Sequence, residues 1–456
     1  LSFGVLMVTF GRLADTFGRR KIFFAGLLVF GLSSLAGAFS VDSGMLIAAR
    51  VFQGVGGAML WPCILGIVYS SVSDDQKGFA GGLILGAAGV GNAAGPLIGG
   101  VLTEFASWRW VLFVNVPICV IAGIITYLEV EKDIPESEVA SIDYAGIAAV
   151  SVSLVSLLYA LNLSPDWGWT SYKTISLLFI FAAVMTAFVV IEFKTRDGLI
   201  PLDVIKNFQF IVCGTIMFTL VPGFFTVLLY MTQYLEKFPE YSPLKAGAAL
   251  VPLLFSFAVM APVSGKIYNK LGARLSIFTG MALCTIGLLL IALIGLDSGF
   301  YGLLPGFIIS GVGLGFAVPS ITTAAVSSVS QSRASLAGGI IYMFQLVGGA
   351  FGLAVVTSIF TDFANNDLLA RLRNAPLKLS GAELQDVSGF ITGSGTKSTL
   401  EQTLGEDRFQ SLYTQIHHAY ISGVDSGLYF TAAFAALGAL TALLFVRRNA
   451  RAVKAA

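Results

Sequence analysis

The stretch Gly11-Arg-Leu-Ala-Asp15-Thr-Phe-Gly18-Arg19-Arg20-Lys21 decides the fold, because it sets a short basic turn between two apolar runs. These runs cover residues 1–10 and 22–39 and carry no charged side chain. About 20 apolar residues are enough for an α-helix to cross the hydrocarbon core of a bilayer. The stretch therefore predicts the connection between two membrane helices, the first only half a span long.

The composition of the whole chain also indicates a membrane protein. Of 456 residues, 56% are hydrophobic and 12% are charged, and the mean hydropathy is +0.84. A soluble domain carries about twice that share of charge, and one soluble core cannot hold so many apolar residues. The net charge of +1 gives no reason to expect nucleic acid as a partner. The four cysteines lie singly in apolar runs, so we expect no disulfide, metal site or cofactor.

Thirteen apolar runs follow one another along the chain, and each is an expected membrane helix. They lie near residues 1–10, 22–39, 45–68, 79–103, 109–128, 143–163, 174–193, 210–235, 246–264, 275–295, 301–328, 337–361 and 427–446. Alternate connections carry seventeen Lys and Arg residues, against four in the short connections of the other side. By the positive-inside rule, the turn at 11–21 and the C-terminal Arg447–Arg448 face the cytoplasm, so we expect a multi-pass protein of the cell membrane with a cytoplasmic C-terminus.

The chain contains an internal repeat. Gln53–Gly56 and Pro62 match Ser310–Gly313 and Pro319 at an offset of 257, and Ala80–Gly82, Gly91 and Gly95 match residues at the same offset. The basic turn recurs at residues 265–274, with Asn269 in place of Asp15. Both copies face the same side, so the repeat is parallel, and two parallel six-helix halves are predicted.

The repeat also divides the chain. We expect a first half at residues 1–128, two linking helices and a loop at 129–207, a second half at 208–446, and a basic tail at 447–456. The span at 210–235 precedes the second basic turn, whereas its counterpart would lie before residue 1. We therefore expect a fragment of a fourteen-span protein that lacks its first helix.

Four motifs together resemble the major facilitator superfamily, and within it the 14-span drug:proton antiporters. The residues that carry the resemblance are Gly11–Lys21, Arg50-Val-Phe-Gln53-Gly54-Val-Gly56, Gly91-Asn-Ala-Ala-Gly95-Pro96-Leu-Ile-Gly99-Gly100, and Trp108-Arg109-Trp110 with Asn115-Val-Pro117. With the inserted helix pair, the resemblance covers essentially the whole chain. It implies the major facilitator fold, proton-coupled efflux by alternating access, and no enzymatic activity.

The first motif is expected to act as a gating latch made of Gly11, Asp15, Gly18, Arg19 and Arg20. The arginines alone are explained by topology, but an acid adds nothing to a positive-inside signal. Asp15 can lie against a helix N-terminus, where the helix dipole favours an anion, or pair with a neighbouring Arg.

Arg50 and Gln53 are the expected proton-coupling network. Arg50 lies about two turns inside a span, where a cation costs about 2.5–3.5 kcal/mol unless it snorkels to the outer surface. Its functional role is to face an acid that binds and releases protons, which the resemblance places on the absent first helix. Gln53 lies one turn further along the same face and either joins this network or bonds to a carbonyl.

The glycines of the third motif form the expected antiporter helix motif, Gly91, Gly95, Pro96, Gly99 and Gly100. They permit close helix packing, and Pro96 bends the helix. Asn92 and Gln345 are possible cavity residues, although hydrogen bonding between helices explains them equally well.

The remaining ionisable groups are expected to lie at span ends. Glu192 is placed at the cytoplasmic border, and His417 and His418 are expected to be solvated in the polar segment 362–426. That segment is either a small cap over the outer mouth or a connector. Its pattern predicts a capping box at Ser380–Glu383 and a helix over Glu406–Tyr420.

The leading hypothesis is thus a proton-coupled exporter of small amphipathic or cationic compounds, working as a monomer with protons, substrate and lipid as its partners. An exporter or importer dedicated to one metabolite, such as a siderophore, peptide or self-made antibiotic, is the alternative within this class. A membrane receptor or membrane-embedded enzyme is the alternative from another class; no catalytic cluster and no P-loop pattern supports an enzyme or an ATP-driven pump.

Overall fold

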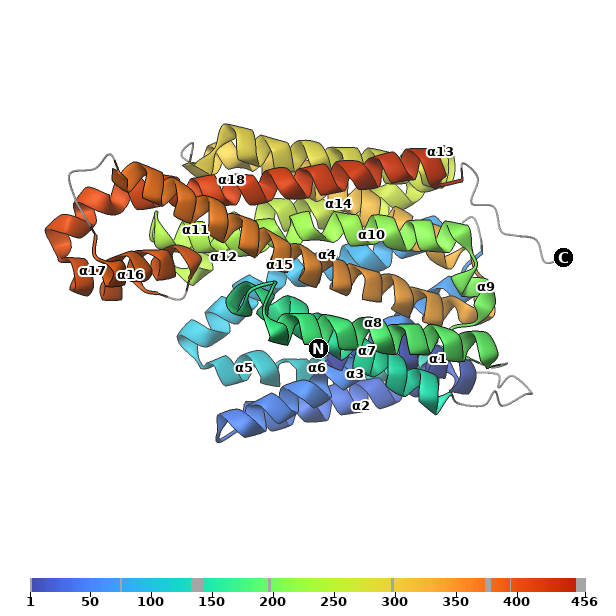
Figure 1. Ribbon diagram of the computed structural model, residues 1–456. Helices are drawn as coiled ribbons and strands as arrows, with labels where there is room; N and C mark the ends of the chain where they lie inside the picture. Colours follow the sequence, from blue (N-terminus) through green and yellow to red (C-terminus); the bar gives the residue numbers. More distant parts are fainter. Residues whose placement is uncertain are drawn as a thin grey trace.

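The computed structural model describes residues 2–73, 76–132, 143–195, 198–296, 299–373, 379–393 and 395–447. Within these ranges the chain folds into helices without strands, and most helices run along one common axis (Figure 1). The all-α polytopic fold expected from the sequence is confirmed. The basic tail beyond Arg447 lies outside the described residues.

The first half consists of six helices. They are α1 (Ser2–Phe17), α2 (Arg19–Ala38), α3 (Ser43–Ser71), α4 (Lys77–Phe105), α5 (Trp108–Phe113) and α6 (Asn115–Glu129). Side-chain caps begin two of them, because Asp42 accepts from the Met45 N–H and Ser107 accepts from the Arg109 N–H.

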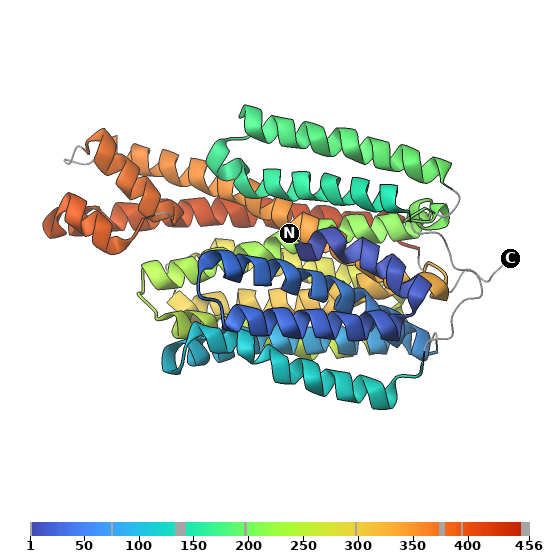
Figure 2. The same cartoon turned by 90° about the horizontal axis from the view of Figure 1, so that it is seen from below.

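Two antiparallel helices link the halves, α7 (Tyr144–Trp167) and α8 (Tyr172–Lys194). We call them the linking pair. Figure 2 shows the linking pair as teal-green helices along one flank of the bundle. Helix α7 packs against both α1 and α15, so the pair lies where the two halves meet. In the turn between α7 and α8, the Trp169 Nε1–H donates to Ser358 Oγ of α15 at 2.7 Å.

The second half begins after the short helix α9 (Leu202–Ile205). Its elements are α10 (Phe208–Thr226), the π-helical turn η1 (Val227–Met231), α11 (Thr232–Lys237), α12 (Pro243–Ala249), α13 (Val251–Ile294), α14 (Gly299–Val326), the 3₁₀ turn η3 (Gln331–Arg333), α15 (Ala334–Arg373), α16 (Gly381–Thr392), α17 (Lys397–Leu404) and α18 (Glu406–Phe445).

Eleven helices among the described residues are long and apolar enough to cross a membrane. One of them, α13, is two helices merged at Gly272, whose φ of 78° reverses the chain. Helix α1 is shorter than a span, with 16 residues. Each of the thirteen expected runs therefore falls on its own helical segment.

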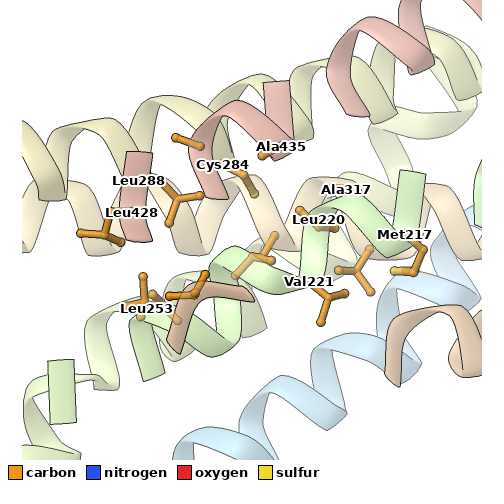
Figure 3. Close-up of a cluster of buried hydrophobic side chains, with 14 of the residues drawn as sticks. Met217, Leu220, Val221, Leu253, Cys284, Leu288, Ala317, Leu428 and Ala435 are labelled. Atoms are coloured by element: carbon orange, nitrogen blue, oxygen red, sulfur yellow. The ribbon is translucent and has the colours of Figure 1, made fainter. Parts of the chain in front are cut away.

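The second half has a tightly packed core. Buried side chains from α10, α13, α14 and α18 meet there, among them Met217, Leu253, Ala317 and Leu428, each with an exposed fraction of 0% (Figure 3). In a bilayer, close van der Waals packing rather than release of water holds such helices together.

Two seams join the halves. At the first seam, α1 and α3 pack against α15, and at the second, α4 packs against α13 and α14. We call the end of the bundle that carries both basic turns the basic end, and the opposite end the cap end. Figures 1 and 2 show α16 and α17, together with the adjoining ends of α15 and α18, projecting beyond the remaining helices at the cap end.

The segment 362–426 forms a cap rather than a plain connector. Helix α15 continues to Arg373 and α18 begins at Glu406, and the hairpin of α16 and α17 joins them. The predicted capping box is present, since Ser380 and Glu383 exchange side-chain and backbone hydrogen bonds. Glu383 also pairs with Arg408 at 2.6 Å, and these bonds hold the pKa of Glu383 below its usual value.

The cap is fixed to the second half. Lys237 of α11 donates to the Phe390 and Ile391 carbonyl oxygens at 2.7 and 2.9 Å, at the C-terminal end of α16. Lys397 pairs with Glu240, and Ser388 donates to Asn365 of α15.

An aromatic cluster seals the base of the cap and corrects one expectation. His417 was expected to be solvated, but its ring stacks on Tyr234 and Tyr413 and contacts Phe238. Its Nε2 lies 3.2 Å from the Tyr234 hydroxyl. The prediction failed because Glu406–Tyr420 continues the last membrane helix, which brings this histidine against α11.

Candidate functional site

The candidate site is the contact between the halves at the basic end. The first basic turn, Gly11–Lys21, ends α1 and begins α2, and Gly18 reverses the chain with a φ of 110°. Only glycine adopts this backbone region without strain. The turn therefore presents Asp15, one turn before Gly18, toward the other half.

Asp15 makes both of the interactions that the sequence allowed. Its Oδ2 accepts from the Leu336 N–H at 2.8 Å, and its Oδ1 accepts from the Ser335 N–H at 3.3 Å. These amides belong to the first turn of α15, where the helix dipole stabilises a negative charge. Arg19 pairs with the same carboxylate at 2.9 Å. The Asp15 side chain is 3% exposed, so this ion pair is nearly dry.

Arg19 ties α3 and η3 to this carboxylate. Beyond Asp15, it donates to the Gly66 carbonyl of α3 at 2.9 Å and to the Gln331 carbonyl of η3 at 2.7 Å. The Gln331 side chain returns a bond to the Ser70 carbonyl at 2.9 Å. Three acceptors offset much of the desolvation of this partly buried cation. Sequence reasoning missed Gln331 and Gly66, because nothing in their local pattern indicates a partner far along the chain.

The first basic turn borders a cavity of about 680 Å³ at the basic end. Asp15, Arg19 and Ser332 line it together with Glu129 and Lys132 at the end of the first half. Gly11 lies against the backbone of α15, since a Cβ there would come within 2.9 Å of the Ser335 carbonyl oxygen.

The second basic turn, residues 265–274, docks on the first half in the same way. Gly265 lies against the start of α4, where a Cβ would come within 2.7 Å of the Gly78 carbonyl carbon. Asn269 takes the place of Asp15, and its Oδ1 lies 2.8 Å from where a Cβ of Gly78 would be.

Each basic turn also holds the last helix of its own half. Arg20 donates to the Tyr127 carbonyl of α6 at 2.9 Å, and Arg274 donates to the Val446 carbonyl after α18 at 2.6 Å. The two copies of the repeat therefore make equivalent hydrogen bonds, each from an arginine of the basic turn to a backbone carbonyl at the end of the last helix.

The expected proton-coupling residues form a chain of hydrogen bonds. Arg50 donates to Gln53 Oε1 at 2.6 Å, and Gln53 donates to Ser34 Oγ at 2.5 Å. Asn115 also reaches Ser34, at 3.4 Å. Gln53 is buried with 6% exposure, whereas Arg50 is exposed. The sequence placed Arg50 and Gln53 together, and the structure adds Ser34 and Asn115.

The antiporter motif lies on α4, whose two ends differ. Toward the basic end, Gly86 and Gly89 are buried against α13, and a Cβ on them would come within 2.9 and 2.8 Å of Pro262 and Phe257. Toward the cap end, no atom of another described element lies within 4 Å of a Cβ position at Gly91, Gly95 or Gly99.

Three further expected residues are less involved. Gly100 contacts Leu244 of α12, Asn92 is exposed, and Gln345 is half-buried on α15. The side chain of Pro96 lies outside the described residues, so the expected bend is not assessed there.

One ionisable residue corrects the sequence analysis. Glu192 lies at the end of α8, the span-end position expected from the sequence, but its side chain is 1% exposed. Its Oε1 accepts from the Ile200 N–H at 2.9 Å. The sequence analysis did not foresee this burial, because the chain after α8 folds back over the carboxylate and a count of apolar residues does not reveal that.

Comparison with known proteins gives a consistent result. The profile of the Major Facilitator Superfamily matches residues 1–353. A tetracenomycin C resistance and export protein of Streptomyces glaucescens is 29% identical over 98% of this chain and 83% of its own length. A puromycin resistance protein of Streptomyces alboniger is 31% identical over 79% of this chain and 72% of its own.

A multidrug transporter protein of Bacillus subtilis is 26% identical over 79% of this chain and 67% of its own length. Among solved structures, the human organic anion transporter MFSD10 superposes with a TM-score of 0.63, over 97% of this chain and 81% of that one. Because the two sequences are only 12% identical, this structural similarity concerns the fold alone.

Proposed function

The chain belongs to the Major Facilitator Superfamily of membrane transporters, and from this premise we propose that it exports small amphipathic or cationic compounds in exchange for external protons. The observation that carries the proposal is the Asp15 latch, which ties the first half to the first turn of α15. The relatives named for drug and antibiotic resistance support a drug-like substrate.

The latch supports alternating access with the basic end in the cytoplasm. Asp15 and Arg19 join elements of both halves at that end, and the glycine face of α4 packs against α13 only near that end. An exporter must load its substrate from the cytoplasm, so the latch must open in each cycle. Residues 1–128 and 208–446 would rock as two bodies around a central site.

Proton coupling is proposed for the network of Arg50, Gln53, Ser34 and Asn115. A cation inside a membrane helix is costly unless it has a partner, so such residues mark ion and proton pathways by default. Arg50 would shift between this network and an acid that takes up the external proton.

The test is the accumulation of a fluorescent cationic dye in cells that express the protein, with and without a proton ionophore. We expect lower accumulation than in control cells, restored by the ionophore. Unchanged accumulation, with the protein verified in the membrane, would reject multidrug export.

A second candidate is export of one specific compound. It is favoured by the relatives whose names refer to single antibiotics, tetracenomycin C and puromycin. A panel of structurally unrelated antibiotics separates the two candidates. Raised resistance to several members supports multidrug export, and raised resistance to one member supports the dedicated exporter.

A further inference from the structure

A cavity of about 480 Å³ lies at the basic end, where the linking pair meets both halves. Its walls come from Arg12 of α1, the last turn of α8, the chain from Gly198 into α9, and Arg333 of η3. Figures 1 and 2 show α9 beside the basic end of α8. The volume falls in the range of about 300–1,000 Å³ that small-molecule sites occupy. Neither the Asp15 latch nor the proposed proton network uses this cavity.

Two cations that line the cavity have no acceptor of their own. Arg12 is half-buried and Lys194 is exposed, and within the described part of the chain neither side chain makes a hydrogen bond or an ion pair. A guanidinium carries five N–H donors and an ammonium carries three. Taking part of the water away from such a group without supplying an acceptor costs free energy, most of all for the half-buried Arg12. These two side chains therefore offer unmatched donors to an anion in the cavity.

The two acids that line the cavity are already committed. Asp203 of α9 pairs with Arg333 of η3. Glu192 is 1% exposed and turns its carboxylate into the loop after α8, where Oε1 accepts from the Ile200 N–H at 2.9 Å. Its Oε2 lies under Gly198, where a Cβ would collide with it. Neither acid therefore serves as the acceptor for the two unpaired cations.

The surroundings favour an anion that is attached to an apolar group. Only 11% of the apolar stretch of α8 is buried inside the protein, so most of this helix faces lipid. Phe193, which is 55% exposed and precedes Lys194, lines the cavity together with Ile200 and Leu202. Basic pockets between membrane helices on the cytoplasmic side bind anionic lipid headgroups. A phosphate in this cavity would meet the cations while its acyl chains stay in the bilayer.

We propose that this cavity binds the phosphate of an anionic lipid headgroup, with Arg12 and Lys194 as its ligands. The planar guanidinium of Arg12 donates to two phosphate oxygens, and Lys194 supplies a second positive charge from α8. The bound phosphate then joins α1 of the first half to the linking pair, beside η3 of the second half, and so favours the closed basic end. The effect on the gate rests on the proposed function, whereas the phosphate site itself does not.

Binding is tested by native mass spectrometry on the delipidated full-length protein, which needs no transport. Phosphatidylglycerol carries a phosphate with net negative charge, phosphatidylcholine cancels that charge with choline, and inorganic phosphate supplies the ion alone. One phosphatidylglycerol should bind at least fivefold more tightly than phosphatidylcholine. Arg12→Gln and Lys194→Gln should each weaken its binding at least threefold. Lys206→Gln changes an exposed cation at the end of α9, outside the cavity, and should leave the affinity unchanged.

A variant of opposite sign guards against general damage to the fold. Glu192→Gln keeps an acceptor for the Ile200 N–H and removes a negative charge from the cavity, so phosphatidylglycerol should bind at least twofold more tightly. Weaker binding in this variant would contradict the electrostatic account. Equal affinity in the wild type, Arg12→Gln and Lys194→Gln overturns the proposal. Binding of inorganic phosphate alone, lost in the same two variants, would support the phosphate chemistry and reject a lipid as its source.

The effect on the gate is tested by dye transport in vesicles of phosphatidylcholine with and without phosphatidylglycerol. A phosphate that holds the basic end closed should slow wild-type and Lys206→Gln transport two- to fivefold, and slow Lys194→Gln by less than half as much. Equal slowing in all three would reject the link to the gate. Lipid binding that depends on Arg12 and Lys194 in a protein without transport would reject the proposed function and leave the site standing. Transport without such binding would do the reverse.

Discussion

In the first basic turn Gly11 lies against the start of α15, and in the second Gly265 lies against the start of α4, at the equivalent point of the repeat. Both turns reverse at a glycine with positive φ, Gly18 or Gly272. They differ at one position, where the first has Asp15 and the second Asn269. The repeat thus supplies the same docking shape at both seams, whereas the two basic turns place different groups there, a carboxylate in the first turn and an amide in the second.

Comparing the two turns therefore distinguishes the contribution of close packing, which both have, from the contribution of the Asp15 charge, which only the first turn has at this position. Helix N-termini stabilise a carboxylate by about 0.3–1 kcal/mol at the surface and up to ~2 kcal/mol when partly buried. An amide keeps one acceptor oxygen, replaces the other with a donor and loses the charge. The first seam should therefore limit the opening of the basic end, and substitutions at the two turns can test this.

The largest effect is expected from Asp15→Asn. It leaves Arg19 with two carbonyl acceptors, so the lost ion pair should cost about 2 kcal/mol rather than the 3–5 kcal/mol of a fully orphaned buried charge. That shifts the gate equilibrium roughly 30-fold toward the open basic end. Because transport also requires this end to close in each cycle, dye efflux should fall at least tenfold with normal membrane insertion. Asp42→Asn, which alters another acidic helix cap, is the control and should transport normally. Normal efflux in the Asp15 variant would remove the latch from the mechanism.

The next effect concerns the shape that both turns share. Gly11→Ala and Gly265→Ala each force a Cβ against backbone, and such overpacking costs about 1–3 kcal/mol. Efflux should drop roughly five- to tenfold in both variants. Gly381→Ala in the cap has open space around its Cβ and should have no effect. A loss in only one of the two turns would mean that the seams do not close together.

A smaller effect is expected from Asn269→Asp, which gives the second turn the charge of the first. The new carboxylate near the start of α4 should stabilise the closed basic end by about 0.3–1 kcal/mol. Efflux should slow by roughly two- to fivefold, and the substitution should partly restore closure in an Asp15→Asn background. Faster efflux would show that charge at the second seam acts in the opposite sense.

The smallest effect is expected at the arginines that hold the last helix of each half. Arg20→Gln and Arg274→Gln each remove a charge-assisted bond to a carbonyl. Arg20 also lies over the rings of Phe24 and Tyr127, so its loss should lower stability by about 1 kcal/mol, against about 0.5 kcal/mol for Arg274. Melting temperatures in detergent should fall by about 1–4 °C, with the larger decrease for Arg20. Equal decreases would show that the ring contacts add nothing.

Much of the fold could be predicted, because bilayer thickness fixes the length of an apolar run. The thirteen runs, the parallel repeat and the capping box at Ser380 all follow from local pattern. Asp15 could be singled out because an acid is unexpected in a basic anchor. Its partners could not, since the amides of Ser335 and Leu336 are bare backbone and carry no sequence signal.

The errors in the prediction share one cause. Glu192 and His417 are both polar residues near the end of an apolar run, where local composition predicts contact with water. Glu192 is buried by the loop after α8, and the half-buried His417 is covered on one side by helix α11. Tertiary contact of this kind is invisible to a scan of hydropathy.

The cap offers a practical handle on this small membrane protein. Lys237, Glu240 and Asn365 all anchor it to the second half. A nanobody raised against α16 and α17 would therefore add mass to one moving body without stapling it to the other. In electron cryomicroscopy, such a complex would provide a feature outside the membrane by which particle images can be aligned. The tilt of the bound nanobody relative to the first half would then report the conformational state of the transporter.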